Sequence, residues 1–278
     1  MIPPTLSLYP PSVGPLPFGS FTFNPSSTTF YNTFDALVRG ADWTLLYSFA
    51  AVGGAAAIGL ALGAVGGFFG GAADQAVLRI GESFRSFPPL VFVLVLIIVL
   101  NYEFSYAIAG GLPYSPWYPE AVVVIAFLVV LWPGFALSVR ARVRQVLAQS
   151  FVAYARACGA PRRRVFFRHV LPLCRRTVAI QFFEAAGLVP LYLVGITWLT
   201  GLVSVPEWGA LVALSASDVQ GFLSTCYVGP CVVPWWQLFF PLMALGFFVL
   251  SALFIAEGLR RMPEPGLLPV APSRPVTA

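Results

Sequence analysis

Lysine is absent from this sequence, and charged residues make up only 10% of its 278 positions. Soluble domains carry roughly 25% charged residues, so a water-soluble fold of this size would have too few charges to cover its surface. The missing lysine also excludes a P-loop, in which a lysine must reach the β- and γ-phosphates of a nucleotide. Any ATP chemistry connected with this chain therefore belongs to a partner.

All sixteen basic residues are arginines, and ten of them lie between Arg140 and Arg176. No base-stacking aromatic residues are spaced through this basic stretch, so a nucleic-acid partner is not expected. Arginines next to apolar runs are typical of the cytoplasmic loops of membrane proteins. The single histidine and four cysteines form no cluster with metal-site spacing, and we expect neither a metal nor another cofactor.

Five apolar stretches are each long enough for a membrane helix, which needs about 20 residues. They cover residues 43–69, 88–109, 119–139, 177–203 and 234–256. The sequence therefore predicts an all-α, polytopic membrane helical bundle with five transmembrane helices. We expect one membrane domain over residues 43–260, with an N-terminal segment over 1–42 before it and a tail over 261–278 after it.

The arginines also predict the orientation. With five spans, fifteen of the sixteen fall on one side of the membrane and only Arg39 falls on the other. The positive-inside rule then places the loop over 140–176 and the C-terminus in the cytoplasm, and the N-terminus outside. The outer side also holds Cys226 and Cys231, for which a disulfide and two free thiols are both open.

Glycines recur at every fourth position at Gly59, Gly63, Gly67 and Gly71. On a helix they form one flat face, which allows a second helix to approach closely. The partner of this face is either another helix of the same chain or a helix of a sister subunit.

The most informative segment reads SFVAYARACGAPRRRVFFRHVLP and runs from Ser150 to Pro172. A short helix is expected over 151–158, ended by Gly159, because glycine commonly follows a helix C-terminus. Pro161 prevents easy continuation, and a second short segment is expected up to Pro172. A loop of this length with a helix of its own usually has a function.

This segment resembles the EAA loop of binding-protein-dependent ABC permeases. In that pattern E-A-A is followed by three residues, a Gly and, about a dozen residues later, a hydrophobic-Pro pair. The matching positions are Ala153, Tyr154 and Ala155 for E-A-A, Gly159 for the Gly, and Leu171-Pro172 for the pair. The run over 168–172 is similar to the dipeptide/oligopeptide/nickel branch, as are Pro206, Trp208 and Gly209 further along.

The resemblance implies that the short helix docks into a groove of a separate ATPase and couples it to the membrane helices. The residues implied in coupling are Ala153, Tyr154, Ala155, Arg156, Gly159 and Ala160. The implied partners are a second homologous permease, two ATP-binding cassette ATPases and an extracellular solute-binding protein, with membrane lipids around the bundle.

Two features depart from the family pattern. Ala153 stands where the family has Glu, so the carboxylate that would contact or orient the ATPase is absent. The family also has a membrane helix ahead of a motif matched near residues 17–19, where about sixteen residues stand here. A misplaced start and a protein without that helix both remain open.

Two groups of charged residues accompany the spans. Helix-spaced ion pairs are expected of Asp74 with Arg79, or of Arg79 with Glu82. Glu184 lies within the fourth apolar stretch, where a carboxylate is costly. It is either a wall of the translocation path or a hydrogen-bonded packing residue.

The resemblance implies a non-catalytic permease subunit that forms half of a translocation path for peptides or similar solutes. The first alternative is an ABC permease for oligosaccharides or another solute. The second is an ion-coupled secondary carrier, which would favour several mid-membrane ionisable residues and broken-helix repeats. The third is a membrane scaffold without a transport role.

Overall fold

The computed structural model describes residues 21–23, 28–30, 33–110, 118–201, 207–225 and 235–262. Its elements are β1 (Phe21–Phe23), β2 (Thr28–Phe30), α1 (Thr33–Phe69), α2 (Gly71–Arg85), α3 (Pro89–Ala109), α4 (Tyr118–Leu147), α5 (Ser150–Ala157), α6 (Arg162–Val165), the π-helical turn η1 (Phe166–Val170), α7 (Leu171–Thr200), α8 (Trp208–Thr225) and α9 (Trp235–Arg261). Apart from the small antiparallel ribbon of β1 and β2, the described chain is helical. The predicted all-α membrane bundle is confirmed.

Within the described residues, four helical stretches are long and apolar enough to cross a bilayer. They are Ala36–Phe69, Tyr118–Leu147, Arg162–Thr200 and Gln237–Arg261. A fifth span is reached if the bent pair of α2 and α3 counts as one crossing. The predicted count of five therefore agrees with the upper count, and the chain is a multi-pass membrane protein.

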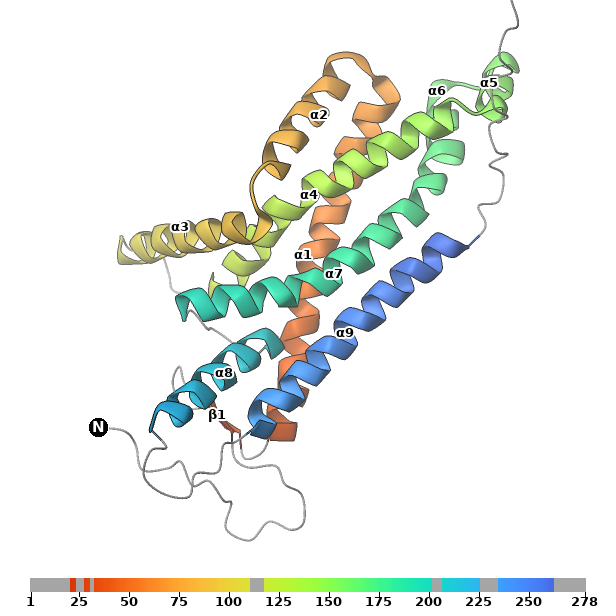
Figure 1. Ribbon diagram of the computed structural model, residues 1–278. Helices are drawn as coiled ribbons and strands as arrows, with labels where there is room; N and C mark the ends of the chain where they lie inside the picture. The colour runs from red at the N-terminus through yellow and green to blue at the C-terminus, as the bar shows by residue number, and fades with distance from the viewer. Residues whose placement is uncertain are drawn as a thin grey trace, which may run out of the picture.

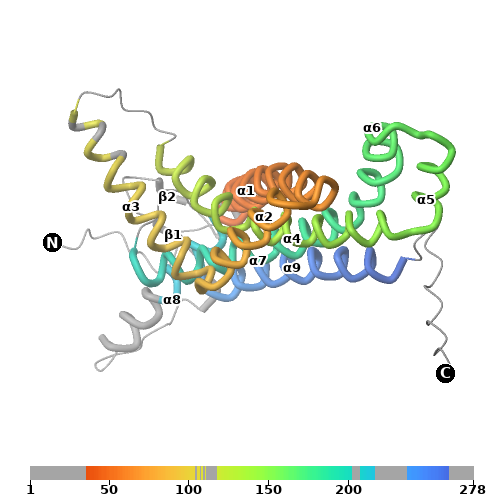
Figure 2. The backbone as a smooth tube through the Cα atoms, turned by 90° about the horizontal axis from the view of Figure 1, so that it is seen from above, coloured from red at the N-terminus to blue at the C-terminus, as the bar shows by residue number. Residues whose placement is uncertain are grey.

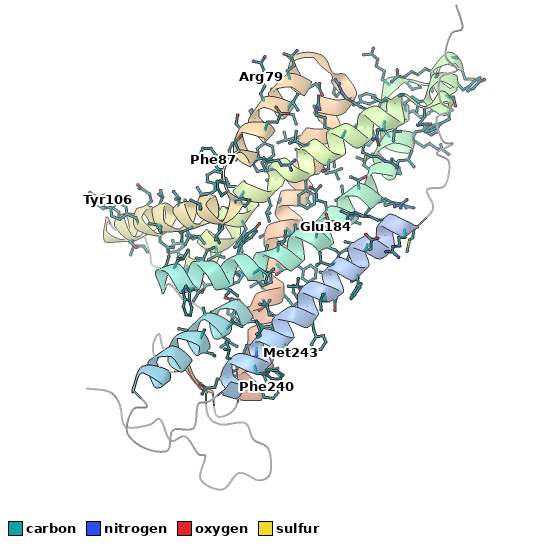
Figure 3. The ribbon with its side chains drawn as sticks, viewed as in Figure 1. Arg79, Phe87, Tyr106, Glu184, Phe240 and Met243 are labelled. Atoms are coloured by element: carbon teal, nitrogen blue, oxygen red, sulfur yellow. The ribbon has the colours of Figure 1, made fainter. Side chains whose placement is uncertain are left out.

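The predicted span over 88–109 begins at a sharp corner. The axes of α2 and of Pro89–Glu103 differ by 89°, and α3 projects sideways from the bundle (Figures 1 and 2). Pro88 and Pro89 explain the corner, because a proline is well placed in the first turn of a new helix but cannot continue an old one. The far half of α3 is uncovered, with Tyr102 68% and Tyr106 72% exposed (Figure 3).

The glycine face of α1 packs on α4 of the same chain. A Cβ at Gly59 or Gly63 would overlap Phe135 or the carbonyl of Ala136, and one at Gly67 would lie 2.9 Å from the carbonyl oxygen of Arg140. The two backbones are therefore in direct contact, as small residues permit. The contact within the chain is the correct alternative for these three glycines, while Gly71 begins α2 and has nothing nearby.

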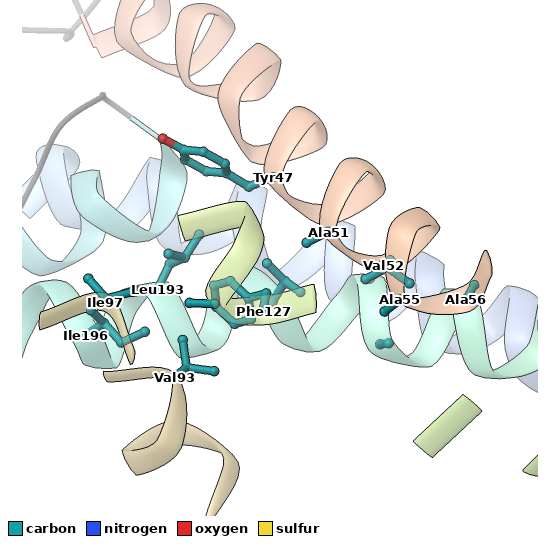
Figure 4. Packing of buried hydrophobic residues seen from close by; sticks show 14 of the residues in the cluster. Tyr47, Ala51, Val52, Ala55, Ala56, Val93, Ile97, Phe127, Leu193 and Ile196 are labelled. Atoms are coloured by element: carbon teal, nitrogen blue, oxygen red, sulfur yellow. The ribbon is translucent and has the colours of Figure 1, made fainter. Parts of the chain in front are cut away.

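The larger apolar core lies where α1, α3, α4 and α7 meet (Figure 4). Tyr47 and Val52 of α1, Phe127 of α4 and Val93 of α3 are at most 2% exposed there. Pro190 lies inside α7, which is visibly bent along its length (Figure 1). A helix-internal proline removes one backbone hydrogen bond and is a common cause of such a bend.

The stretch over 204–233, between the last two predicted apolar stretches, contains the helix α8. Sequence reasoning missed this helix because its apolar run is shorter than a membrane span and ends in polar residues. Cys226 and Cys231 lie outside the described residues, so a disulfide and two free thiols both stay predictions.

Candidate functional site

The short helix α5 stands at one end of the bundle, beyond the ends of α4 and α7 (Figure 1). It covers Ser150–Ala157, one residue earlier than predicted. It ends as expected at Gly159, whose φ of 78° lies in the left-handed region. The amide of Gly159 donates to the carbonyl of Arg156 and that of Ala160 to Ala155, both at 3.0 Å. This is the Schellman arrangement, which requires a left-handed residue and so favours glycine.

The residues singled out for coupling divide into two groups. Tyr154, Arg156 and Ala153 are exposed, and the Tyr154 side chain is 73% exposed. Ala155 and Ala160 are half-buried on the inner side. A large aromatic side chain left this open, next to a guanidinium, is typical of a surface that a partner covers.

The inner side of α5 is held by a second apolar cluster. Val152 of α5 is 1% exposed and belongs to a buried cluster that also contains Ala64 of α1, Val143 of α4 and Cys174 of α7. The Phe151 ring also lies 6.4 Å from that of His169. One cluster thus includes residues of α5 and of three long helices.

The chain enters α7 through a widened helical turn. The amide of Leu171 bonds to the carbonyl of Phe166, five residues back, and η1 links α6 to α7 as one rod of residues 162–200. Pro172 explains the wide turn, since it has no amide to donate and its ring would clash with the carbonyl four residues earlier. Such single π turns frequently mark functional positions in helices.

A buried ion cluster joins α2 to α4 close to this end. Arg140 donates from Nε to Oδ1 of Asp74 at 2.5 Å and from Nη2 to Oδ2 at 2.9 Å. Arg144 donates to the same Oδ2 at 2.6 Å. The predicted local pairing of Asp74 with Arg79 is therefore wrong, because the partners of Asp74 lie some seventy residues away, as for Arg144.

The ends of α7 and α9 are also tied together. Arg176 donates to the carbonyls of Leu259 and Arg260 at 2.8 and 2.7 Å, which satisfies two of the free carbonyls in the last turn of α9. Glu184 forms an ion pair with Arg260 and lies between α7 and α9 (Figure 3). Its role as a wall of the path stays a prediction.

At the opposite end, α8 is fastened by two consecutive residues, Glu207 and Trp208. The Glu207 carboxylate accepts the amides of Gly209 and Ala210, both at 2.5 Å, and caps α8. The Trp208 indole donates to the carbonyl of Leu37 at 2.8 Å. Burial raises the pKa of Glu207 to about 8, while the two backbone amides act in the opposite direction. Sequence reasoning matched Trp208 and Gly209 to a family motif but missed Glu207, whose cap position could have been suspected from the following apolar run.

The described residues thus define an integral membrane protein with long spans, one exposed helix anchored at an end of the bundle, and no nucleotide-binding lysine. This is the architecture of a membrane transport subunit.

The chain belongs to the family described as binding-protein-dependent transport system inner membrane component, whose pattern matches residues 55–268. It is 27% identical over 240 residues to the dipeptide transport system permease protein DppC of Alkalihalophilus pseudofirmus, covering 84% of this chain and 68% of that one. It is 28% identical to the oligopeptide transport system permease protein OppC of Haemophilus influenzae, covering 83% and 67%. It is 26% identical to the nickel transport system permease protein NikC of Escherichia coli K12, covering 76% and 67%.

These comparisons confirm the predicted resemblance to the dipeptide/oligopeptide/nickel branch of ABC importer permeases. They favour the permease over the ion-coupled carrier and the scaffold.

Proposed function

We propose that a partner ATPase binds the exposed side of α5. Movement of the ATPase is then transmitted through α5 to the membrane helices of this permease subunit. The observation that carries the proposal is the contrast between the two sides of α5. Tyr154 is 73% exposed, whereas Val152, two residues earlier, is buried in a cluster that includes residues of α1, α4 and α7. A force applied to the outer side therefore reaches three membrane helices through one packed cluster.

The transmission has two further supports. The Asp74–Arg140 pair holds α2 against α4, and Arg176 holds the end of α9 against α7. When two ATPases close around ATP, the α5 helices of two permease subunits approach each other. The attached spans then rock as units, which opens the path on the opposite side of the membrane.

Ala153 shapes the expected ATPase contact. It is exposed and offers a methyl group where the family pattern has a carboxylate. In its place Tyr154 offers an aromatic body with a hydroxyl, and Arg156 offers a forked donor. We infer that the partner surface is apolar opposite Tyr154 and acidic opposite Arg156.

The orientation and the partners follow from the same assignment. The arginine-rich end with α5 and the C-terminus faces the cytoplasm, where ATP is available, and the N-terminus lies outside. Residues 43–260 form the permease domain, with 140–176 as its coupling loop. The assembly contains a second homologous permease, two ATPases and an extracellular solute-binding protein.

Peptides or similar solutes are the proposed cargo, because the names of the similar proteins include dipeptide and oligopeptide permeases. A purified binding protein from the same system tests the cargo directly. Its affinity for di- and oligopeptides should exceed its affinity for oligosaccharides of similar size, and the reverse order would exclude peptides.

Capture of the ATPase tests the coupling. Tagged full-length chain is isolated from its native membranes, and co-isolated proteins with a P-loop sequence are quantified by mass spectrometry. Tyr154→Ala should reduce ATPase recovery about tenfold, as expected for about 1.4 kcal/mol of lost binding. Phe254→Ala is the matched control, since Phe254 is 72% exposed on α9, and it should leave recovery unchanged.

A second pair of variants distinguishes an effect of the α5 end on ATPase binding from a general effect of backbone strain. Gly159→Val forces a β-branched residue to a φ of 78° and should disturb the end of α5 and reduce ATPase recovery. Gly201→Val imposes the same strain at a φ of 65° at the end of α7. Equal recovery with both valine variants would contradict the assignment of α5 as the coupling helix.

A further inference from the structure

A groove of about 470 Å³ runs along the surface between α1 and the first half of α7. Its walls include Leu60 of α1 and Ala179, Phe182 and Phe183 of α7. Arg175 also lines the groove and is its charged residue. The groove is therefore apolar along its length, with a cation towards the arginine-rich end.

The dimensions of the groove suit one leaflet of a bilayer. Its lining on α7 extends from Leu171 to Phe183, which is roughly 18 Å along a helix at 1.5 Å per residue. Half of the hydrocarbon core of a bilayer is about 15 Å. An acyl chain in the groove would therefore lie alongside α7 with its polar end near Arg175.

The charges at the Arg175 end of the groove favour an anionic lipid head group. The segment from Arg140 to Arg176 contains ten arginines and no Asp or Glu. Within the described part of the chain, no carboxylate lies within ion-pair distance of Arg175. A guanidinium binds a phosphate through a planar pair of donors.

A second hollow, at the start of the helical rod, also combines arginines with an aromatic side chain. Arg163, Arg164 and Arg168 surround it together with Phe167, whose ring is 57% exposed and lies 6.0 Å from the Arg163 guanidinium. Arginines next to an exposed aromatic ring are typical of the polar boundary of a bilayer. This hollow extends the positive field beyond the mouth of the groove, and basic pockets between membrane helices bind anionic lipid head groups.

We propose that the groove between α1 and α7 is a site for an anionic phospholipid. One acyl chain lies against Leu60, Phe182 and Phe183, and the phosphate lies against Arg175. The lipid lies between two helices that both contribute to the α5 cluster, and its contacts involve neither the exposed side of α5 nor a solute.

Lipid retention tests this site. Full-length chain is reconstituted into nanodiscs with equal parts of phosphatidylglycerol and phosphatidylcholine and then extracted gently, and the retained lipids are quantified by mass spectrometry. Wild-type protein should retain phosphatidylglycerol preferentially, and Arg175→Gln should reduce that preference about fivefold, as expected for one arginine at the membrane surface. Arg79→Gln is the control, because it removes the same charge from an exposed position on α2 (Figure 3).

A second variant tests the apolar part. Ala179→Trp fills the groove and should reduce retention of both lipids, whereas Leu250→Trp on the exposed side of α9 should not. Equal losses for Arg175→Gln and Arg79→Gln would mean diffuse attraction and would overturn the proposal. Cross-linking of Ala179→Cys to a sister chain would overturn it as well, because a second subunit would then cover the groove.

Discussion

The guanidinium of Arg140 meets the carboxylate of Asp74 at two points, with Nε 2.5 Å from Oδ1 and Nη2 2.9 Å from Oδ2. The Arg140 side chain is 15% exposed and that of Asp74 only 7%. If one member of so poorly hydrated a pair is removed, the other charge is left buried without a counter-charge, and the folded protein is strongly destabilised. This pair is the main polar link between α2 and the helix that leads into α5.

Asp74→Asn should therefore lower the free energy of unfolding by about 3 kcal/mol, through the uncompensated charge on Arg140. Arg144 is the internal comparison, because its side chain bonds to the same carboxylate but is 52% exposed. Arg144→Gln should cost less than about 1 kcal/mol. Thermal unfolding of both variants in nanodiscs measures the difference, and equal destabilisation would show that burial does not determine the strength of this cluster.

The contact between α1 and α4 leads to a second prediction. Gly63→Ala places a methyl group against the carbonyl of Ala136 and should destabilise the protein by about 1–3 kcal/mol through overpacking. Gly53→Ala is the matched control in the same helix, since nothing lies within 4 Å of its added Cβ. It should be neutral or stabilising by up to about 1 kcal/mol, from the better helix propensity of alanine. Destabilisation by both changes would place the cost in the helix itself rather than at the contact.

Uptake measurements separate the two roles open to Glu184. Glu184→Gln removes the carboxylate and its ion pair with Arg260, whereas Arg260→Gln removes the pair but leaves the carboxylate. If Glu184 lines the path, solute uptake into proteoliposomes with the complete transporter should fall only with Glu184→Gln. Equal losses with both variants would assign the effect to the link between α7 and α9, and unchanged uptake with Glu184→Gln would remove the path role.

Glu207 predicts a pH dependence of stability. Its pKa is raised from 4.5 to about 8 by burial, so the folded protein binds a proton more tightly than the unfolded chain. The resulting stabilisation is complete below about pH 4.5 and is lost as the pH rises through about 8. Glu207→Gln should flatten the decrease in unfolding temperature over this range.

The control for this titration is Glu82→Gln, which changes an exposed carboxylate on α2. It should keep the wild-type slope between pH 4.5 and 8. A slope that persists in Glu207→Gln would mean that other groups determine the pH dependence.

Local signals in the sequence predicted most of the fold. The long apolar runs identified α1, α4, α7 and α9, because a membrane span is defined by its own composition and length. Gly159 identified the end of α5 for a similarly local reason, since few other residues adopt a positive φ at low cost.

The features that sequence reasoning missed depend on residues far apart in the chain. Asp74 has a plausible local partner in Arg79, and only the packing of α2 on α4 shows that Arg140 is closer. The partner of the Gly63 face was open for the same reason. The position of α8 depends likewise on a distant contact, that of Trp208 with Leu37.

The glycine face has a mechanical consequence for the transport cycle. At Gly59, Gly63 and Gly67 α1 contributes no side chain to its contact with α4, whose backbone carbonyls approach it directly. We therefore expect these two helices to move together as one rigid body during the transport cycle. Outside this pair, helix-internal prolines lie at Pro190 in α7 and Pro241 in α9, and we expect any bending between inward and outward openings to concentrate there.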